Sequence, residues 1–585
     1  MKRIAEGSTN RFNGGSLSRT DQTQMNALRK LAIFFVAPIG FWGGAHAGET
    51  LYNGIVLPDQ WPPAYDRHPK QSQMLVPYLE KPPAVIPIDV GRQLLVDDFL
   101  IESTTLQRTF HTAEYHPANP VIRPDKPWEF GSGGWFAAPF SGGAWYDSSD
   151  QLFKMWYTGG YLHWSCLATS KDGIAWDKPA FDIKNGTNVV IRPIEPKATR
   201  SVDTTSVWLD HDAKNPSERF KYFGTESGHT DRWAMVYRTS PDGIHWTDAL
   251  TKERIHGDRS TVFYNPFRKV WVLSERISWG GRARRYSEHA DPKKLMDEGV
   301  LRDPKKGVNW IAGEMIDPRN PVEELGRKPE LYNLDAAPYE SLMIGAFTIW
   351  TGPSNDECGK QSLQKRNDIL LGFSRDGFHW DRPDRRHFIS STWDKKNWRY
   401  GNVQSVATGC LVVGDKLYFY FSGRSKPGLG MYDTETKKTE GWDKDAATGL
   451  AILRRDGFAS MDAGKRGGTL TTRPLTFKGS HLFVNLDSSE GELRAEVLDE
   501  EGKVIAPFTK ENCEPVVGDQ THAAVRWQDD LSKVSGQPVR FRFHLKNGDL
   551  YAFWVSPTAS GASNGYVSGG GPGFAGPTDT VGRQQ

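Results

Sequence analysis

The stretch SKDGIAWDKP, from Ser170 to Pro179, recurs as SPDGIHWTD from Ser240 and as SRDGFHWDRP from Ser374. Asp-Gly is a tight-turn signal, because glycine accepts a positive φ and aspartate bonds the local backbone. A Trp three residues after the glycine can fold back over that turn. A weaker fourth copy, RRDGFAS from Arg454, keeps the Asp-Gly pair and lacks the Trp. The repetition predicts one structural unit that is built several times.

A second repeat consists of short runs of aromatic and β-branched residues, which are typical of buried strands. The five runs are LFKMWYTGG from Leu152, FKYFGTES from Phe220, KVWVLSER from Lys269, SLMIGAFT from Ser341 and KLYFYFSG from Lys416. Each run follows another strand and a turn-rich link. Five copies of a four-stranded meander predict an all-β fold with a five-bladed β-propeller, in which the Ser-x-Asp-Gly-x-x-Trp turns are structural.

Composition divides the rest of the chain. Residues 48–84 are Pro-rich and are expected to wrap the surface before the propeller, which we place at 85–460. Residues 461–557 alternate polar and apolar positions between Ser-Glu-Gly, Glu-Gly and Asn-Gly turns, which predicts a β-sandwich of jelly-roll type. Residues 558–585 are rich in Gly, Ser and Pro, and we expect this tail to be disordered.

Residues 1–47 have the pattern of an N-terminal extension followed by a signal peptide. The basic pair Arg29-Lys30 precedes an apolar run from Leu31 to Trp42, and an A-x-A cleavage signal ends at Ala47. The run is too short to span a bilayer as a helix. We therefore expect cleavage near Ala47 and a periplasmic or extracellular protein without a membrane span.

The charge balance and the cysteines narrow the function classes. Basic residues number 73 and acidic residues 71, and the resulting charge of +2 gives no electrostatic case for nucleic acid as a partner. The 21 Trp residues suit sugar binding, because a sugar ring presents an apolar C–H face. The four cysteines form no C-x-x-C pair and the histidines have no metal-ligand spacing. No metal or cofactor is expected, although a structural calcium ion is left open.

Candidate acids stand at the starts of the predicted innermost strands. A propeller directs these starts to one end of its central channel, so residues that are distant in sequence converge there. Asp203 lies in SVDTTSVW, Asp258 in HGDRSTVF, and Glu330 and Asp335 in ELYNLDAAP. Glycosidic bond cleavage requires such a set, with one protonated acid for the leaving oxygen and one ionised carboxylate across the sugar.

The five-blade pattern with acids at inner-strand starts, followed by a β-sandwich, resembles the five-bladed glycosidases of glycoside hydrolase families 32 and 43. The phrases LLVDDFLIE, HPANPVIRPDKPWE and FKMWYTGG also resemble a group of exported bacterial proteins described as similar to these families, over most of residues 85–557. The families carry an Asp in the first blade, an Asp in the second and a Glu in the third.

The resemblance implies roles for individual residues. Asp203 matches the second-blade Asp, which stabilises the transition state or tunes the pKa of the acid. Asp258 stands where the families have Glu, and GWFAAPF in the first blade contains no acid. We expect Glu129, in the loop that enters this strand, to supply the missing carboxylate. The structural alternatives are an ion pair between Asp258 and Arg259, and a loop-capping role for Glu129.

The sequence therefore predicts an exported glycosidase that acts on the chain ends of a poly- or oligosaccharide, with Asp203, Asp258 and Glu129 as catalytic residues. The predicted substrate-binding residues are Trp135, Arg259, Glu330, Asp335, Asn402 and Gln404. The alternative is a non-catalytic carbohydrate-binding propeller, which the missing first-blade Asp favours. The sugar, the anomer, the stereochemical outcome and the oligomeric state are left open.

Overall fold

The structure is a computed structural model, and it describes residues 48–64, 73–131, 134–191, 202–228, 233–255, 257–297, 307–361, 365–394, 397–424, 431–432, 439–440 and 446–582. The predicted signal peptide lies outside the described residues. The chain divides into the units 1–47 and 48–585, and the fold below is that of the second unit. In the described ranges, no helix has the length and apolar character needed to cross a membrane.

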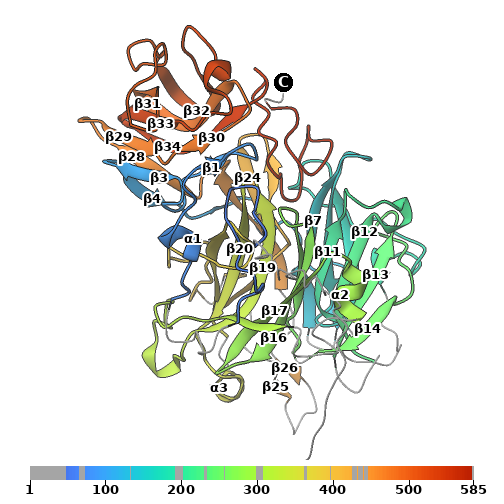
Figure 1. Cartoon of the computed structure of the whole chain (residues 1–585). Helices are drawn as coiled ribbons and strands as arrows, with labels where there is room; N and C mark the ends of the chain where they lie inside the picture. Colours follow the sequence, from blue (N-terminus) through green and yellow to red (C-terminus); the bar gives the residue numbers. More distant parts are fainter. Residues whose placement is uncertain are drawn as a thin grey trace, which may run out of the picture. The chain divides into compact units, whose positions relative to one another are not determined.

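The chain is all-β, as predicted, and five groups of antiparallel strands follow one another; we refer to them as the first to fifth meander (Figure 1). The first contains β7 (Gly134–Asp147), β8 (Leu152–Gly159), β9 (Trp164–Ser170) and β10 (Val189–Ile191). The second contains β11 (Val202–Leu209), β12 (Phe220–Glu226), β13 (Ala234–Ser240) and β14 (Thr251–Arg254). The third contains β15 (Thr261–Asn265), β16 (Val270–Ser278), β17 (Arg282–His289) and β18 (Val308–Ala312).

The fourth meander contains β19 (Glu330–Tyr339), β20 (Leu342–Trp350) and β21 (Asn367–Ser374). The fifth contains β22 (Asn402–Val406), β23 (Leu411–Val413), β24 (Lys416–Arg424), β27 (Ala446–Arg454) and β5 (Glu114–Tyr115). The first, second, fourth and fifth meanders, with β6 (Phe130–Gly131), belong to a sheet that closes as a barrel, whereas the third forms a separate four-stranded sheet. Parallel pairing joins β7 to β11, the first strand of the second meander, and to β27 of the fifth meander.

The three Ser-x-Asp-Gly turns share one geometry. In the turn at Ser170, the N–H of Gly173 donates to the serine hydroxyl at 2.8 Å, and Asp172 accepts two further backbone N–H groups. The turns at Ser240 and Ser374 repeat these bonds. Gly173 has a φ of +76°, which explains why glycine stands at this position.

These turns also fasten one meander to the next, which explains why the chain repeats them. Trp156 donates its indole N–H to the Gly243 carbonyl at 2.9 Å, and Trp310 does the same to the Phe378 carbonyl at 2.8 Å. The Tyr420 hydroxyl donates to the Gly173 carbonyl at 2.7 Å. Each turn is therefore held by a buried aromatic side chain from an adjacent meander.

The C-terminal strands form one nine-stranded sheet (Figure 1). Its members are β2 (Gln93–Leu94), β3 (Ile101–Thr104), β4 (Gln107–Phe110), β28 (Ala459–Ala463), β29 (Gly468–Thr472), β31 (His481–Leu498), β32 (Val516–Val525), β33 (Arg540–Lys546) and β34 (Gly548–Ser556). A separate parallel pair joins β1 (Ile86–Pro87) to β30 (Leu475–Thr476). The division of these strands into the two sheets of a sandwich is not confirmed.

The boundary predicted at residue 85 is wrong for residues 93–110, which we placed in the propeller. β3 pairs with β29 and β4 pairs with β28, so this early segment completes the C-terminal sheet. Figure 1 shows these early strands in blue beside the orange ones. The apolar pattern of LLVDDFLIE identifies buried strands, but it carries no information about which sheet they join.

The prediction of a disordered tail is wrong for residues 558–582. The N–H of Gly569 donates to the Cys410 carbonyl at 2.7 Å, and the N–H of Val412 donates to the Gly570 carbonyl at 2.8 Å. Val567 is fully buried. A Cβ atom on Gly571 would lie 1.8 Å from the Val412 carbonyl oxygen. The glycines of this segment therefore permit close backbone packing against the fifth meander.

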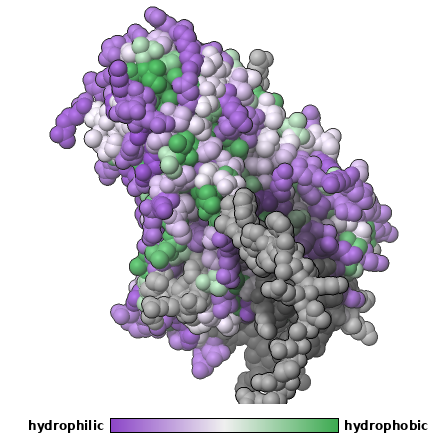
Figure 2. Space-filling view, in the orientation of Figure 1, coloured by the Kyte–Doolittle hydropathy of each residue, from purple (hydrophilic) through white to green (hydrophobic). Residues whose placement is uncertain are grey.

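The Pro-rich segment before the sheet contacts the turn at Ser374. Asn53 donates to the Arg375 carbonyl at 2.9 Å, and the Tyr78 hydroxyl donates to the His379 carbonyl at 3.2 Å. The α-helices of the described ranges are short and comprise α1 (Pro77–Glu80), α2 (Pro292–Asp297) and α3 (Asn355–Gln361). Hydrophilic residues cover most of the face shown in Figure 2, where hydrophobic residues form small separate patches.

Candidate functional site

Arg259, which precedes β15, contacts side chains from four other meanders. Its guanidinium carbon lies 3.9 Å from the centroid of the Phe140 ring and 5.7 Å from that of Tyr332. Its Nη1 atom lies 3.9 Å from Asp203 Oδ1, and its Nη2 donates to Ser405 Oγ at 2.7 Å. Arg259 is only 2% exposed. The inner strands thus converge on one buried cation.

Asp203 and Asp258 come together beside this arginine. Asp203 lies on β11 and is 4% exposed. The Thr204 hydroxyl donates to Asp203 Oδ1 at 2.9 Å and to the Asp258 carbonyl at 3.3 Å. Burial and, next, the negative charge of Asp258 raise the pKa of Asp203 to about 7, against the opposing effect of Arg259. Asp203 therefore holds a proton over much of the range below neutral pH.

Asp335 is a second buried carboxyl group in this region, and it lies between three meanders. It accepts the Val406 N–H at 3.1 Å and the Asn333 side-chain amide at 2.9 Å. The same Asn333 amide donates to Ser141 Oγ of the first meander at 3.0 Å. Burial raises the pKa of Asp335, whereas the Ser141 hydrogen bond and the charge of Arg259 lower it. Its hydrogen bonds to the Val406 backbone and to Asn333 favour a structural or positioning role.

The fifth meander contributes two buried amides. The Gln404 carbonyl accepts the Thr348 hydroxyl at 3.1 Å, while Gln404 Nε2 has no hydrogen-bond partner in the described part of the chain. Asn402 Oδ1 accepts the Asn367 side-chain amide at 3.0 Å. The Gln404 side-chain amide is therefore buried without a partner among the described residues, whereas Asn402 is engaged with a neighbouring strand.

Glu330 is paired with Arg282 at the edge of the cluster. Its Oε2 atom accepts the backbone N–H of Arg282 at 2.9 Å and lies 3.1 Å from the Arg282 guanidinium. That guanidinium lies 4.3 Å from the centroid of the Trp350 ring and 5.4 Å from that of Tyr332. Glu330 thus positions an arginine against two aromatic rings.

Glu129 lies in a separate buried network of the first meander. Its carboxylate accepts the Tyr157 hydroxyl at 2.7 Å and lies 2.7 Å from Lys178 Nζ. It also accepts the backbone N–H groups of Asp125 and Lys126 at 2.8 and 2.9 Å. The structure gives Glu129 no contact with Asp203 or Asp258, and its bonds are those of a loop cap.

Trp135, at the start of β7, makes an edge contact with Phe130, with 5.3 Å between ring centroids. The Phe130 side chain is largely exposed, so an aromatic pair is accessible at this end of the strand. No contact joins Trp135 to the acid pair among the described residues.

Several residues of the cluster were missed by the sequence analysis. Arg424, at the end of β24, lies 4.6 Å from the centroid of the Tyr161 ring. Arg284 on β17 is fully buried and donates to the backbone carbonyls of Arg259 and Tyr332. A signal was present for Arg284, because the alternate arginines of RARRYSEH place cations on one face of a strand.

Among the described residues, no three His, Cys, Asp or Glu side chains form a group that could hold a metal ion. The four cysteines are buried and free. The cluster around Arg259 itself presents carboxyl groups, cations and aromatic rings.

No protein-family model matches the chain, and no curated protein matches it in sequence. Solved structures do resemble it. A family 43 arabinoxylan arabinofuranohydrolase from Bacillus subtilis is 10% identical and covers 75% of this chain and 97% of its own, with a TM-score of 0.32. A fructofuranosidase from Schwanniomyces occidentalis is 12% identical and covers 76% of this chain and 98% of its own, with a TM-score of 0.33.

A third similar structure belongs to the family 130 mannoside phosphorylases, which contains hydrolases that target β-1,2 mannosidic linkages in Candida mannan. It is 12% identical, covers 60% of this chain and 97% of its own, and has a TM-score of 0.37. The names of these three structures describe enzymes that act on carbohydrates. The likeness is distant and assigns no residue of this site.

Proposed function

We propose that the protein is an exported glycoside hydrolase, that its five meanders are the blades of a five-bladed propeller, and that Asp203 and Asp258 are its acid pair. The observation that supports this most directly is the raised pKa of Asp203 beside the charge of Asp258. A buried acid that holds a proton up to about neutral pH, with a second carboxyl group beside it, supplies the pair that cleavage of a glycosidic bond requires.

The two acids take different roles in this proposal. Asp203 donates its proton to the leaving glycosidic oxygen, in place of the stabilising role that the resemblance implied for it, and Asp258 acts as base or nucleophile. The buried rings of Phe140 and Tyr332 flank Arg259 and hold its guanidinium beside Asp203. Hydrogen bonds between the inner strands of different meanders close the barrel along its axis. A substrate could then enter from one end only, which favours a pocket over an open groove and action on chain ends.

A panel of aryl glycosides tests the proposal with wild-type protein and with Asp203→Asn, Asp258→Asn and Asp98→Asn. Asp98 is a matched control, because its side chain is 72% exposed. We expect hydrolysis of at least one glycoside, which the first two variants lose and the control retains. Sugar binding without hydrolysis of any substrate would instead support the carbohydrate-binding alternative, which is favoured by the absence of an acid in GWFAAPF of β7.

A further inference from the structure

Three cations surround the ring of Tyr332 on β19. Arg259 Cζ, Arg282 Cζ and Lys365 Nζ lie 5.7, 5.4 and 5.6 Å from the ring centroid. They come from different segments of the chain, before β15, on β17 and before β21. Of the three, Arg282 has a close carboxylate partner, Glu330 at 3.1 Å. The other two cations therefore decide the local charge.

Neither of these two cations is neutralised by a close carboxylate of the described residues. The nearest such oxygen to Arg259 is that of Asp203 at 3.9 Å, and the Nε and Nη1 atoms of Arg259 have no hydrogen-bond partner in the described chain. Lys365 has no ion pair with any described residue, although it is only 9% exposed. A buried cation without a close counter-charge is costly, so an anion from outside would stabilise both groups.

Neighbouring groups add to the positive potential. Arg284 is fully buried, and its hydrogen bonds go to uncharged oxygens. Burial, followed by the charges of Arg259 and Arg276, lowers the pKa of Arg284 to about 9. Asp203, with a pKa of about 7, offsets part of this charge near neutral pH, and the charges of Asp335 and Asp258 also act on Arg284. None of these carboxyl groups forms a close ion pair with Arg284 or Lys365 in the described chain, so both cations lack a direct counter-charge.

We propose that the sugar bound at this site carries an anionic substituent, a carboxylate or a sulfate ester, which Arg259 and Lys365 hold beside Tyr332. The inference rests on the proposed function and names its substrate class. Arginine suits this task, because its planar fork matches the oxygen geometry of such groups. Since Arg259 also lies beside Asp203, the substituent belongs to the sugar at the point of cleavage.

Calorimetric titration of the full chain tests the proposal with matched pairs of sugars. The pairs are glucuronic acid with glucose and galactose 6-sulfate with galactose, and sodium phosphate is titrated separately. A charge-assisted hydrogen bond contributes enough that one charged sugar should bind at least about tenfold more tightly than its neutral partner. This preference should decline as sodium chloride is added, a measurement that requires no variant.

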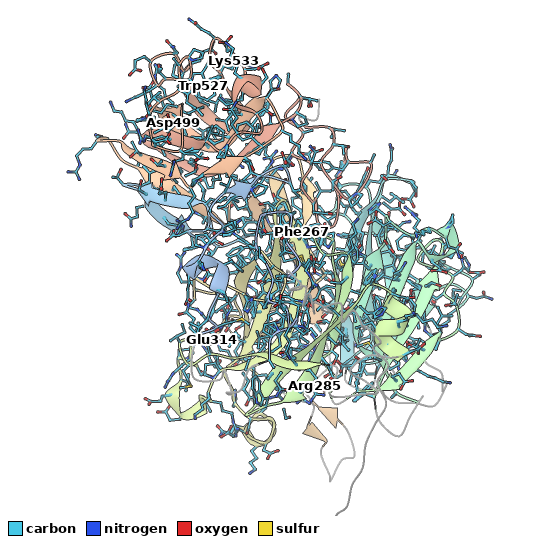
Figure 3. The ribbon with its side chains drawn as sticks, in the orientation of Figure 1. Phe267, Arg285, Glu314, Asp499, Trp527 and Lys533 are labelled. Carbon is cyan, nitrogen blue, oxygen red and sulfur yellow. The ribbon has the colours of Figure 1, made fainter. Side chains whose placement is uncertain are left out.

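Lys365→Met should lower the charged-to-neutral affinity ratio by about tenfold. Lys533→Met is the control, because Lys533 has a side chain that is 60% exposed and is paired with Asp529 outside the cluster (Figure 3). Its ratio should match that of the wild type. Equal affinities within both sugar pairs would overturn the proposal. Phosphate binding without any preference between the paired sugars would also overturn it, by identifying a free-anion site.

The outcomes separate this inference from the proposed function. Hydrolysis of neutral glycosides together with equal affinities within both sugar pairs would leave the glycosidase and remove the anionic substituent. A preference for charged sugars without hydrolysis of charged or neutral glycosides would leave a binding site for anionic sugars and remove the glycosidase.

Discussion

Arg259 Nη1 lies 3.9 Å from Asp203 Oδ1, yet the pKa of Asp203 is raised to about 7 instead of lowered. Burial of the carboxyl group and the negative charge of Asp258 outweigh the arginine. The arginine is shared with Ser405 and the rings of Phe140 and Tyr332, so it is not a dedicated partner of the acid. This balance leaves a proton on Asp203 up to about neutral pH, as its proposed role as the acid requires.

Removing either acid should abolish most of the activity. We expect Asp203→Asn and Asp258→Asn each to lower kcat/KM by at least about a hundredfold, the lower end of general acid-base contributions. In the wild type, the rate should fall as the pH rises above about 7, because Asp203 then loses its proton. Steady-state kinetics across pH on an identified substrate gives both results. Wild-type rates in both variants would remove the acid pair from the mechanism.

Asp203 should also make stability depend on pH. Its pKa is raised from the usual 3.8 to about 7, so the folded state binds the proton more tightly than the unfolded chain. The stabilisation from protonation is complete below about pH 4 and is lost as the pH rises through about 7. Thermal unfolding across this range should show Tm falling less with pH in Asp203→Asn than in the wild type. Parallel Tm profiles would contradict the assigned shift.

The sequence predicted which residues converge wherever convergence depends on strand order alone. Asp203, Asp258 and Arg259 stand at starts of inner strands, and any closed arrangement of meanders brings such positions together. Glu129 does not join these residues, because its proximity in sequence to β7 says nothing about the direction of a loop side chain. The Glu129 carboxylate instead accepts a hydrogen bond from Lys178, which lies 49 residues later in the sequence.

The fold shows the same division. Asp-Gly turns and aromatic runs predicted the meanders because those signals act locally. The pairing of residues 93–110 with strands beyond residue 458 depends on contacts that are distant in sequence. Glycine composition likewise cannot separate a disordered tail from one that packs closely, as Gly571 does against Val412.

Glu129 should contribute to stability more than to catalysis. Glu129→Gln removes the buried charge that faces Lys178 at 2.7 Å, and we expect a loss of about 3 kcal/mol in unfolding free energy. Glu102→Gln serves as the control, because Glu102 is exposed and faces Arg540 at the surface. Urea unfolding of both variants measures the difference. A loss of activity in Glu129→Gln at wild-type stability would instead restore its predicted catalytic role.

The turn at Ser240 should depend on its glycine for packing as well as for φ. A Cβ atom on Gly243 would lie 2.4 Å from Trp156, and Gly243 has a φ of +79°. Gly186 has a similar φ of +75°, and a Cβ atom there would meet no other atom within 4 Å, so Gly186→Ala reports backbone strain alone. We expect Gly243→Ala to destabilise the fold by about 1–3 kcal/mol more than this control. Equal losses would show that Trp156 moves aside freely.

The segment after β34 should be part of the stable fold. Val567 is fully buried, and its neighbours Gly569 and Gly570 bond to the fifth meander. We expect Val567→Ala to cost about 2 kcal/mol, as the removal of two buried methyl-sized groups implies. Val517→Ala removes the same atoms from a side chain that is 53% exposed and should have little effect.

Deletion of the chain after Ser556 extends the same test. The deletion removes Val567 and Asp579, whose carboxylate lies 3.1 Å from the buried guanidinium of Arg455. Loss of that partner adds to the loss of packing, so we expect the truncated chain to unfold at a lower Tm than Val567→Ala. Calorimetric melting of both proteins provides the measurement. A truncated protein that melts with the wild type would mean that the segment rests on the fifth meander without stabilising it.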